Sequence, residues 1–203
     1  MFECITFDWN FFFTYLSGIG TFVICLTTVF GVLSWKQKIW LSQKIEVIND
    51  SMKNRDICYN AAAPLANILE GCFRPYLKGY EINFSEMDFT LMRKRIFSFI
   101  EKDHNIEELK NAILNLKILS NKIKALKIQH HKELSELINL HNKQADTIVS
   151  IIESAKLDEK DFDENLFMDR VQTFRSYNFS GGLNKTTTDL QVKLNEAYTD
   201  ILK

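Results

Sequence analysis

The sequence predicts an all-α protein with one N-terminal transmembrane helix, followed by a cytosolic helical bundle or coiled coil. Three observations support this fold class. No charged residue occurs between Asp8 and Lys36. No glycine or proline, the residues that most often interrupt regular structure, occurs from Tyr80 to Ser180. Apolar residues also recur at helical spacing within 106–157.

The uncharged segment predicts a transmembrane helix over residues 11–35. At ~1.5 Å per residue this segment reaches roughly 37 Å, enough to cross a hydrocarbon layer of about 30 Å with some tilt. A cleaved secretory signal fits poorly, because residues 1–10 contain Glu3 and Asp8 but no basic residue. Side chains suited to the headgroup levels flank the segment: Trp9, Trp35, Lys36, Lys38 and Trp40.

The basic residues around the predicted span indicate its orientation. None precedes the span, whereas Lys36, Lys38 and Lys44 follow it. Because flanking Lys and Arg residues are retained on the cytoplasmic side, we expect a short extracytoplasmic N-terminus at residues 1–10. Residues 36–203 would then form the cytosolic domain of a single-pass protein of the cell (inner) membrane.

Small side chains form one stripe along the predicted span. Their spacings of four and three residues place them on one helix face: Thr14, Gly18, Thr21, Cys25 and Thr28. Such a face lets a second helix approach closely, which favours a homo-oligomer. Small residues are also simply frequent in membrane helices, so both interpretations stay open.

Composition excludes several function classes for the part after the span. It contains all 25 basic residues and all but two of the 26 acidic residues of the chain, so its charge is nearly balanced. A balanced domain has no electrostatic footprint for nucleic acid. The four cysteines are scattered and form no CxxC pair, which leaves zinc ribbons and thioredoxin-type redox sites unsupported.

Capping patterns and the Gly/Pro punctuation predict the cytosolic helices. Ser85, Asn105 and Asp161 are each followed three residues later by an acidic residue, which is typical of helix starts. A strand signal occurs only near 80–84. We expect helices at about 36–59, 61–72, 86–103, 106–157, 162–178 and 185–202.

The longest predicted helix, 106–157, carries a heptad-like seam. Its members are Ala112, Leu116, Leu119, Ile123 and Leu126. An unbroken helix would extend roughly 78 Å, so the segment predicts either a coiled coil or a helical hairpin with a turn, for which 139–142 is the weakest point. Residues 107–132 have a net charge of +4 and residues 153–170 of −4. These two faces either meet or are solvated.

No residue pattern predicts an enzyme, a cofactor or a metal. A di-iron bundle needs two Glu-x-x-His pairs, and only Glu101 and His104 form one. His130 and His141 would lie about 16 Å apart along one helix, too far to share an ion. Gly-x-Ser-x-Gly, phosphate-loop and His-Glu-x-x-His motifs are absent. The aromatic and basic segment 73–76 reads as a recognition loop or a structural turn.

These observations predict a non-enzymatic, membrane-anchored interaction or scaffold protein that self-associates. The expected partners are the lipid bilayer, further copies of the chain and another membrane or cytosolic protein. The layout resembles that of many small single-span bacterial membrane proteins whose cytosolic helices mediate assembly or signalling. The alternative is a membrane effector of toxin or defence type, whose span perturbs the membrane on triggering.

Overall fold

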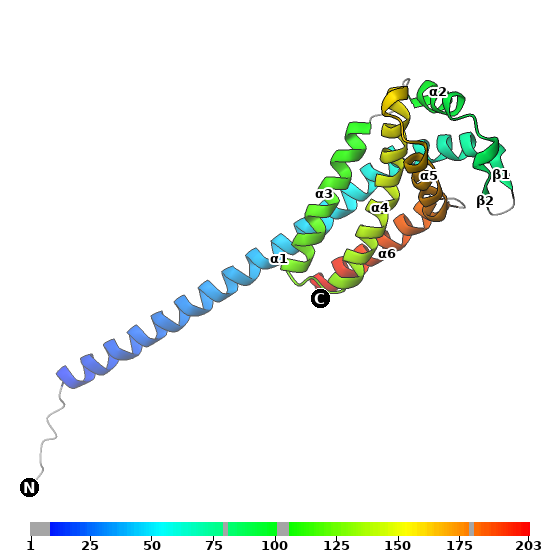
Figure 1. Ribbon diagram of the computed structural model, residues 1–203. Helices are drawn as coiled ribbons and strands as arrows, with labels where there is room; N and C mark the ends of the chain where they lie inside the picture. The colour runs from blue at the N-terminus through cyan, green and yellow to red at the C-terminus, as the bar shows by residue number, and fades with distance from the viewer. Residues whose placement is uncertain (1–8, 79–80, 101–105, 179–180) are drawn as a thin grey trace, which may run out of the picture. The chain divides into compact units, whose positions relative to one another are not determined.

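The computed structural model describes residues 9–78, 81–100, 106–178 and 181–203. These residues form six α-helices and a two-stranded antiparallel ribbon, which confirms the predicted all-α class (Figure 1). The helices are α1 (Trp9–Phe73), α2 (Phe89–Ile100), α3 (Ile106–Ala125), α4 (His131–Lys156), α5 (Glu164–Asn178) and α6 (Gly182–Leu202). The chain divides into two compact units, and the boundary lies between Gln43 and Lys44.

The first unit contains the N-terminal part of α1. Every side chain from Thr14 to Gln43 is exposed. Within the described residues, one helical stretch, Thr14–Tyr76, is long and apolar enough to cross a membrane, and its most apolar part has no protein contact that buries it. This stretch contains most of the predicted span, 11–35.

The second unit begins with the remainder of α1, from Lys44 to Phe73. The sequence predicted two helices, 36–59 and 61–72, but the structure has one helix that runs through Pro64. A proline inside a helix removes one backbone hydrogen bond. Buried apolar residues on both sides of it keep the segment helical: Cys58, Ala62, Leu65, Ala66 and Leu69.

Residues 106–157 form a hairpin of α3 and α4, so the single long helix is wrong and the hairpin alternative is correct. The turn lies at residues 126–130, and the predicted weak point at 139–142 lies inside α4. Lys127 and His130 have positive φ angles of 47° and 61°, which end one helix and begin the next. Ile128 is fully buried between them and holds the turn against the core.

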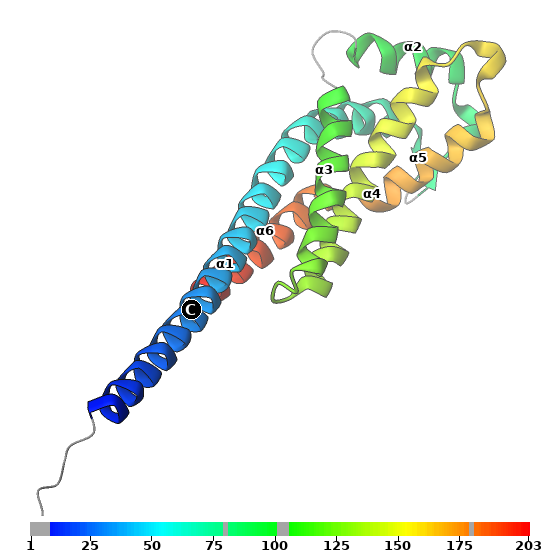
Figure 2. The same cartoon turned by 90° about the vertical axis from the view of Figure 1, so that its left-hand side faces the viewer.

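α4 is the central helix of the second unit. It packs against α2, α3, α5 and α6, and Figure 2 shows α3 and α6 beside it. Its buried face includes Leu134, Ile138, Ile148 and Ile152. Because four neighbours surround this helix, its apolar face is covered within the chain.

The helix starts differ from the predicted caps by two or three residues. Leu91 donates its backbone N–H to Oδ1 of Asp88 at 3.0 Å, so Asp88 caps α2 in place of Ser85. Leu166 donates in the same way to Asp163 at 3.0 Å, which replaces Asp161. The predicted cap Asn105 lies outside the described residues.

Two glycines mark the connection between α5 and α6. Gly181 has φ +80°, a left-handed conformation that favours glycine. A Cβ on Gly182 would lie 2.0 Å from the carbonyl oxygen of Tyr177, so only glycine fits there. The predicted start of the last helix at 185 therefore moves to Gly182.

The segment 73–76 is a structural turn whose first ring lies in an aromatic cluster. Phe73 is fully buried, whereas Arg74 and Pro75 are exposed. The cluster contains Phe73, Phe89, Phe162, Phe167 and Phe174, with neighbouring ring centroids 5.3–6.4 Å apart. The chain then enters β1 (Leu77–Lys78), which pairs with β2 (Glu81–Ile82).

Candidate functional site

The small-residue stripe of the span lies on an exposed helix face. All five members are exposed: Thr14, Gly18, Thr21, Cys25 and Thr28. The three threonine hydroxyls donate to the backbone carbonyl oxygen four residues earlier, at 2.7–2.8 Å. The hydroxyl protons are therefore satisfied inside the helix, as an apolar environment requires.

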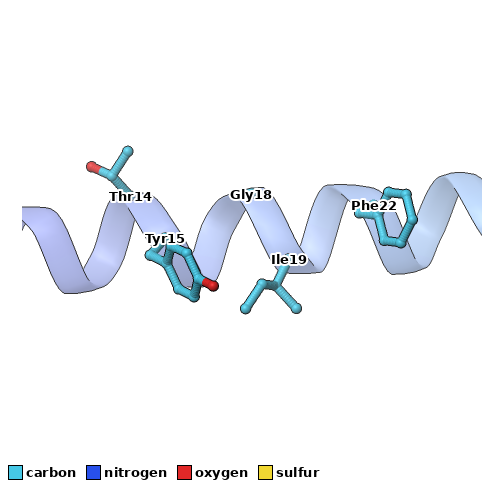
Figure 3. A pocket seen from close by; sticks show the side chains of 5 residues that line it. All are labelled: Thr14, Tyr15, Gly18, Ile19 and Phe22. Carbon is cyan, nitrogen blue, oxygen red and sulfur yellow. The ribbon is translucent and has the colours of Figure 1, made fainter.

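A shallow hollow of about 380 Å³ lies beside Gly18 on this helix (Figure 3). It is lined by Thr14, Tyr15, Gly18, Ile19 and Phe22. A Cβ added to Gly18 would meet no atom within 4 Å, so the hollow is open. Two of the five lining residues belong to the stripe, and the larger side chains lie beside it.

The predicted interfacial anchors flank the most apolar part of α1. Trp35 and Trp40 are 64% and 52% exposed, and Lys36 and Lys38 are exposed too. Trp9 is the first residue of α1. Exposed tryptophans beside a long apolar helix are the arrangement found at lipid headgroup levels.

The heptad-like seam faces the core of the second unit. Ala112, Leu116, Leu119 and Ile123 are buried, and Leu126 is partly buried against the same core. α3 packs directly on α4. The seam is therefore occupied within the hairpin, and a coiled coil between copies through this face would require the hairpin to open.

A buried polar group lies between α1, α4 and α6. Nε2 of His141 is 3.1 Å from the hydroxyl of Thr187, and both residues are buried. Burial, together with the nearby positive charge of Arg55, lowers the pKa of His141 to about 4. The imidazole is thus neutral near pH 7.

Arg55 itself is buried at 4% exposure and directs part of its guanidinium outward. Nε and Nη2 donate to Oδ1 of Asp56 at 3.1 and 2.5 Å. Burial also raises the pKa of Cys58 to about 12, so this thiol is protonated and unreactive. Within this group, the Cys58 thiol is therefore not an activated nucleophile.

The remaining sequence hypotheses concern metals and charge. Among the described residues, no group of three or more His, Cys, Asp and Glu side chains is placed to hold a metal ion. Glu101 and His104 lie outside that part of the chain. The basic and acidic segments are linked by the ion pair of Lys110 with Glu153 at 2.7 Å, while Lys117 and Lys124 are exposed to solvent.

Sequence reasoning identified the long apolar helix and missed the buried charge. Arg55 lies among polar residues and reads as a solvated position, although it follows Ser51 and precedes Cys58 and Ala62 at helical spacing on a buried face. That helical spacing is the feature of the sequence from which the burial of Arg55 could have been predicted. The pairing of His141 with Thr187 joins residues 46 apart, which local patterns do not encode.

Comparison with known proteins gives no functional assignment. The chain matches no protein-family model, no curated protein and no solved structure. The sites described above are therefore the basis for a functional proposal.

Proposed function

We propose that this chain is a single-pass, membrane-anchored helical interaction or scaffold protein that self-associates through its span. One observation carries the proposal: the apolar side chains from Thr14 to Gln43 are exposed on a helix long enough to cross a membrane. An exposed apolar surface of this extent in water is unfavourable, and lipid covers it without cost. The second unit, with its own buried core, would present surfaces for partners.

The proposed orientation places the N-terminus outside and residues 36–203 in the cytoplasm of a cell with an inner membrane. It is supported by the basic residues that follow the span. A fluorescent reporter that folds only in the cytoplasm, fused after Lys203, tests it. Fluorescence is the expected result; activity of a periplasmic reporter at the same site would contradict the orientation.

Self-association through the stripe is supported by the open surface beside Gly18 and by the satisfied threonine hydroxyls. Gly18→Leu fills the hollow and should reduce crosslinked dimer in membranes by about tenfold if the helices pack there. Gly20→Leu is the matched control, because position 20 lies about 120° from the stripe. Equal loss in both variants, or in neither, would contradict a dimer through this face.

The membrane-effector alternative makes a different prediction for the intact protein. Overexpression of an effector depolarises the cell, whereas a scaffold inserts without effect on the membrane potential. A voltage-sensitive dye in cells that express the full-length chain separates the two functions. We expect an unchanged potential, and rapid depolarisation would replace the scaffold proposal with the effector.

A further inference from the structure

The turn between α3 and α4 carries basic side chains and no acidic ones. Residues 121–132 contain four lysines and two histidines and no acidic residue. The four lysines are exposed, and none forms an ion pair with another residue that the structure describes. We call them the lysine tip: Lys122, Lys124, Lys127 and Lys132.

Contacts between α4 and α6 place the turn at one end of the second unit. His141 lies beside Thr187, and His130, at the turn, lies 3.6 Å from a carboxylate oxygen of Asp200. The two helices are therefore antiparallel, with the lysine tip beside the C-terminal end of α6. Figure 1 shows the turn and the chain end at the same end of this unit.

The same reasoning places the start of α1's second part at that end. Arg55 lies near His141, and Tyr59 lies 3.4 Å from Asn184. From Arg55 to Tyr59, α1 therefore runs toward the first residue of α6, away from the turn between α3 and α4. In the opposite direction α1 leads from Arg55 to Lys44, so Lys44 and the lysine tip lie at the same end.

Chain connectivity joins this end of the second unit to the predicted span. The eight residues 36–43 separate Lys44 from the end of the span at Trp35. Even a fully extended linker of this length covers only about 30 Å. The end of the second unit that carries the lysine tip is therefore the end that these eight residues join to the predicted span.

Three acidic groups near the tip pair with lysines outside it. Glu133 and Glu196 each lie 2.9 Å from Lys193, and Asp200 lies 3.0 Å from Lys203. These five residues have a net charge of −1, against +4 for the lysine tip. These three carboxylates therefore pair with lysines other than the four of the lysine tip, while Glu46 and Glu136 are further exposed acidic residues toward this end.

We propose that the lysine tip docks onto anionic phospholipid headgroups of the leaflet next to it. This inference rests on the proposed membrane anchoring. Several lysines near an anionic surface attract it over about one screening length, which is ~8 Å at physiological salt. The span supplies proximity, and the lysine tip would hold the domain against the membrane.

The test uses the full-length chain in lipid nanodiscs. A fluorophore is attached at Gln129→Cys, an exposed turn position, or at Gln172→Cys, an exposed control on α5. Cys4 and Cys25 are replaced by serine, and the buried Cys58 and Cys72 are retained. Quenching by a lipid with a nitroxide headgroup is compared between neutral discs and discs with about 30% anionic phosphatidylglycerol.

We expect about twofold stronger quenching at position 129 in anionic than in neutral discs, and loss of this difference in 1 M salt. Position 172 should show no difference. Replacing the lysine tip with glutamine should remove the effect, whereas the control set with the same change of charge should keep it. That control set replaces Lys94, Lys143, Lys160 and Lys185, all of them exposed.

Each other outcome overturns a specific claim. If the chain is retained in the discs but quenching at position 129 does not depend on lipid charge, the lysine tip does not dock on lipid. Strong quenching that survives the glutamine substitutions also contradicts docking through these lysines. If the chain does not stay in the discs, the membrane anchoring itself is wrong.

Discussion

The two parts of α1 form one continuous helix but cover their apolar side chains differently. From Thr14 to Gln43 every side chain is exposed, whereas from Lys44 to Phe73 buried and exposed positions alternate with helical period. In the second part, Ile48, Leu65 and Leu69 are at most 1% exposed, because other helices of the same chain cover them. The difference is the one expected between a helix that is apolar on all sides, which lipid would cover, and a helix with a single apolar face, which protein covers.

Charge distribution separates the two parts as clearly as hydropathy does. The first has no charged residue before Lys36, and the second places its charges mainly on exposed positions. Arg55 is the exception, since it is buried and reaches Asp56 with part of its guanidinium. We therefore expect an added charge to destabilise the second unit when it lies on the buried face of α1, and to hinder membrane insertion when it lies in the first part.

The largest effect is expected for a charge in the core part of α1. Leu69→Lys buries an ammonium group at a fully buried position and should lower the free energy of unfolding of the second unit by at least about 4 kcal/mol. Asn67→Lys, at an exposed position in the same turn, should change it by less than about 0.5 kcal/mol. Chemical unfolding in detergent, followed by circular dichroism, measures both; equal effects would contradict the assigned face.

The same kind of substitution in the span should act on insertion and leave folding unchanged. Val23→Lys places a charge near the centre of the apolar segment and should cost about 3 kcal/mol of membrane insertion. Val23→Leu is the control and should insert as the original chain does. Quantitative insertion into microsomes checks this, and a loss of bundle stability in Val23→Lys would show that the span packs on the bundle.

Acidification should destabilise the core part through His141. Its pKa is about 4 in the folded protein and about 6.5 when unfolded, so the unfolded state binds the extra proton as the pH falls between these values. This contribution of His141 to the free energy of unfolding is fully present above about pH 6.5, and about 3 kcal/mol of it is lost as the pH falls toward 4. Unfolding at several pH values measures it.

His141→Gln removes the titrating group and should flatten this pH dependence. His130→Gln, at the partly exposed turn position, is the matched control and should retain the loss. If both variants keep the full pH dependence, protonation of His141 is not its cause.

The smallest effect is expected at the surface. The hydrogen bond and charge of Lys193 lower the pKa of Glu133, and Lys193→Met should let that pKa rise toward the ordinary value of a glutamate. Lys132→Met, which removes a lysine without an ion-pair partner among the described residues, should leave it unchanged. Carboxyl carbon NMR titration reads the pKa directly, and an unaltered pKa in Lys193→Met would show that the pair does not persist in solution.

The all-α class and the long apolar helix flanked by tryptophan and lysine follow from local sequence properties. Uncharged length and helical spacing are enough to predict them. The turn at 126–130 was missed because Lys127 and His130 adopt positive φ angles without glycine or asparagine. The burial of Ile128 stabilises this turn through tertiary packing, which a local reading of residues does not contain.

The candidate sites likewise divide into those visible in the local sequence and those that depend on tertiary packing. The stripe around Gly18 is visible in the spacing of small residues, since a lone helix needs no tertiary information. The seam around Leu119 was correctly predicted to be an apolar face. Its partner is α4 of the same chain, which the seam residues alone did not identify. The spatial neighbourhood of Arg55 and His141 arises only when three helices come together.

Membrane integration of the full-length chain tests the central claim most directly. Membranes that contain the chain are washed with alkaline carbonate and floated on a density gradient. Lipid coverage of the exposed apolar helix predicts that the intact chain stays with the floated membranes. Release of the intact, folded chain into the supernatant would contradict the assignment of Thr14–Gln43 to the bilayer.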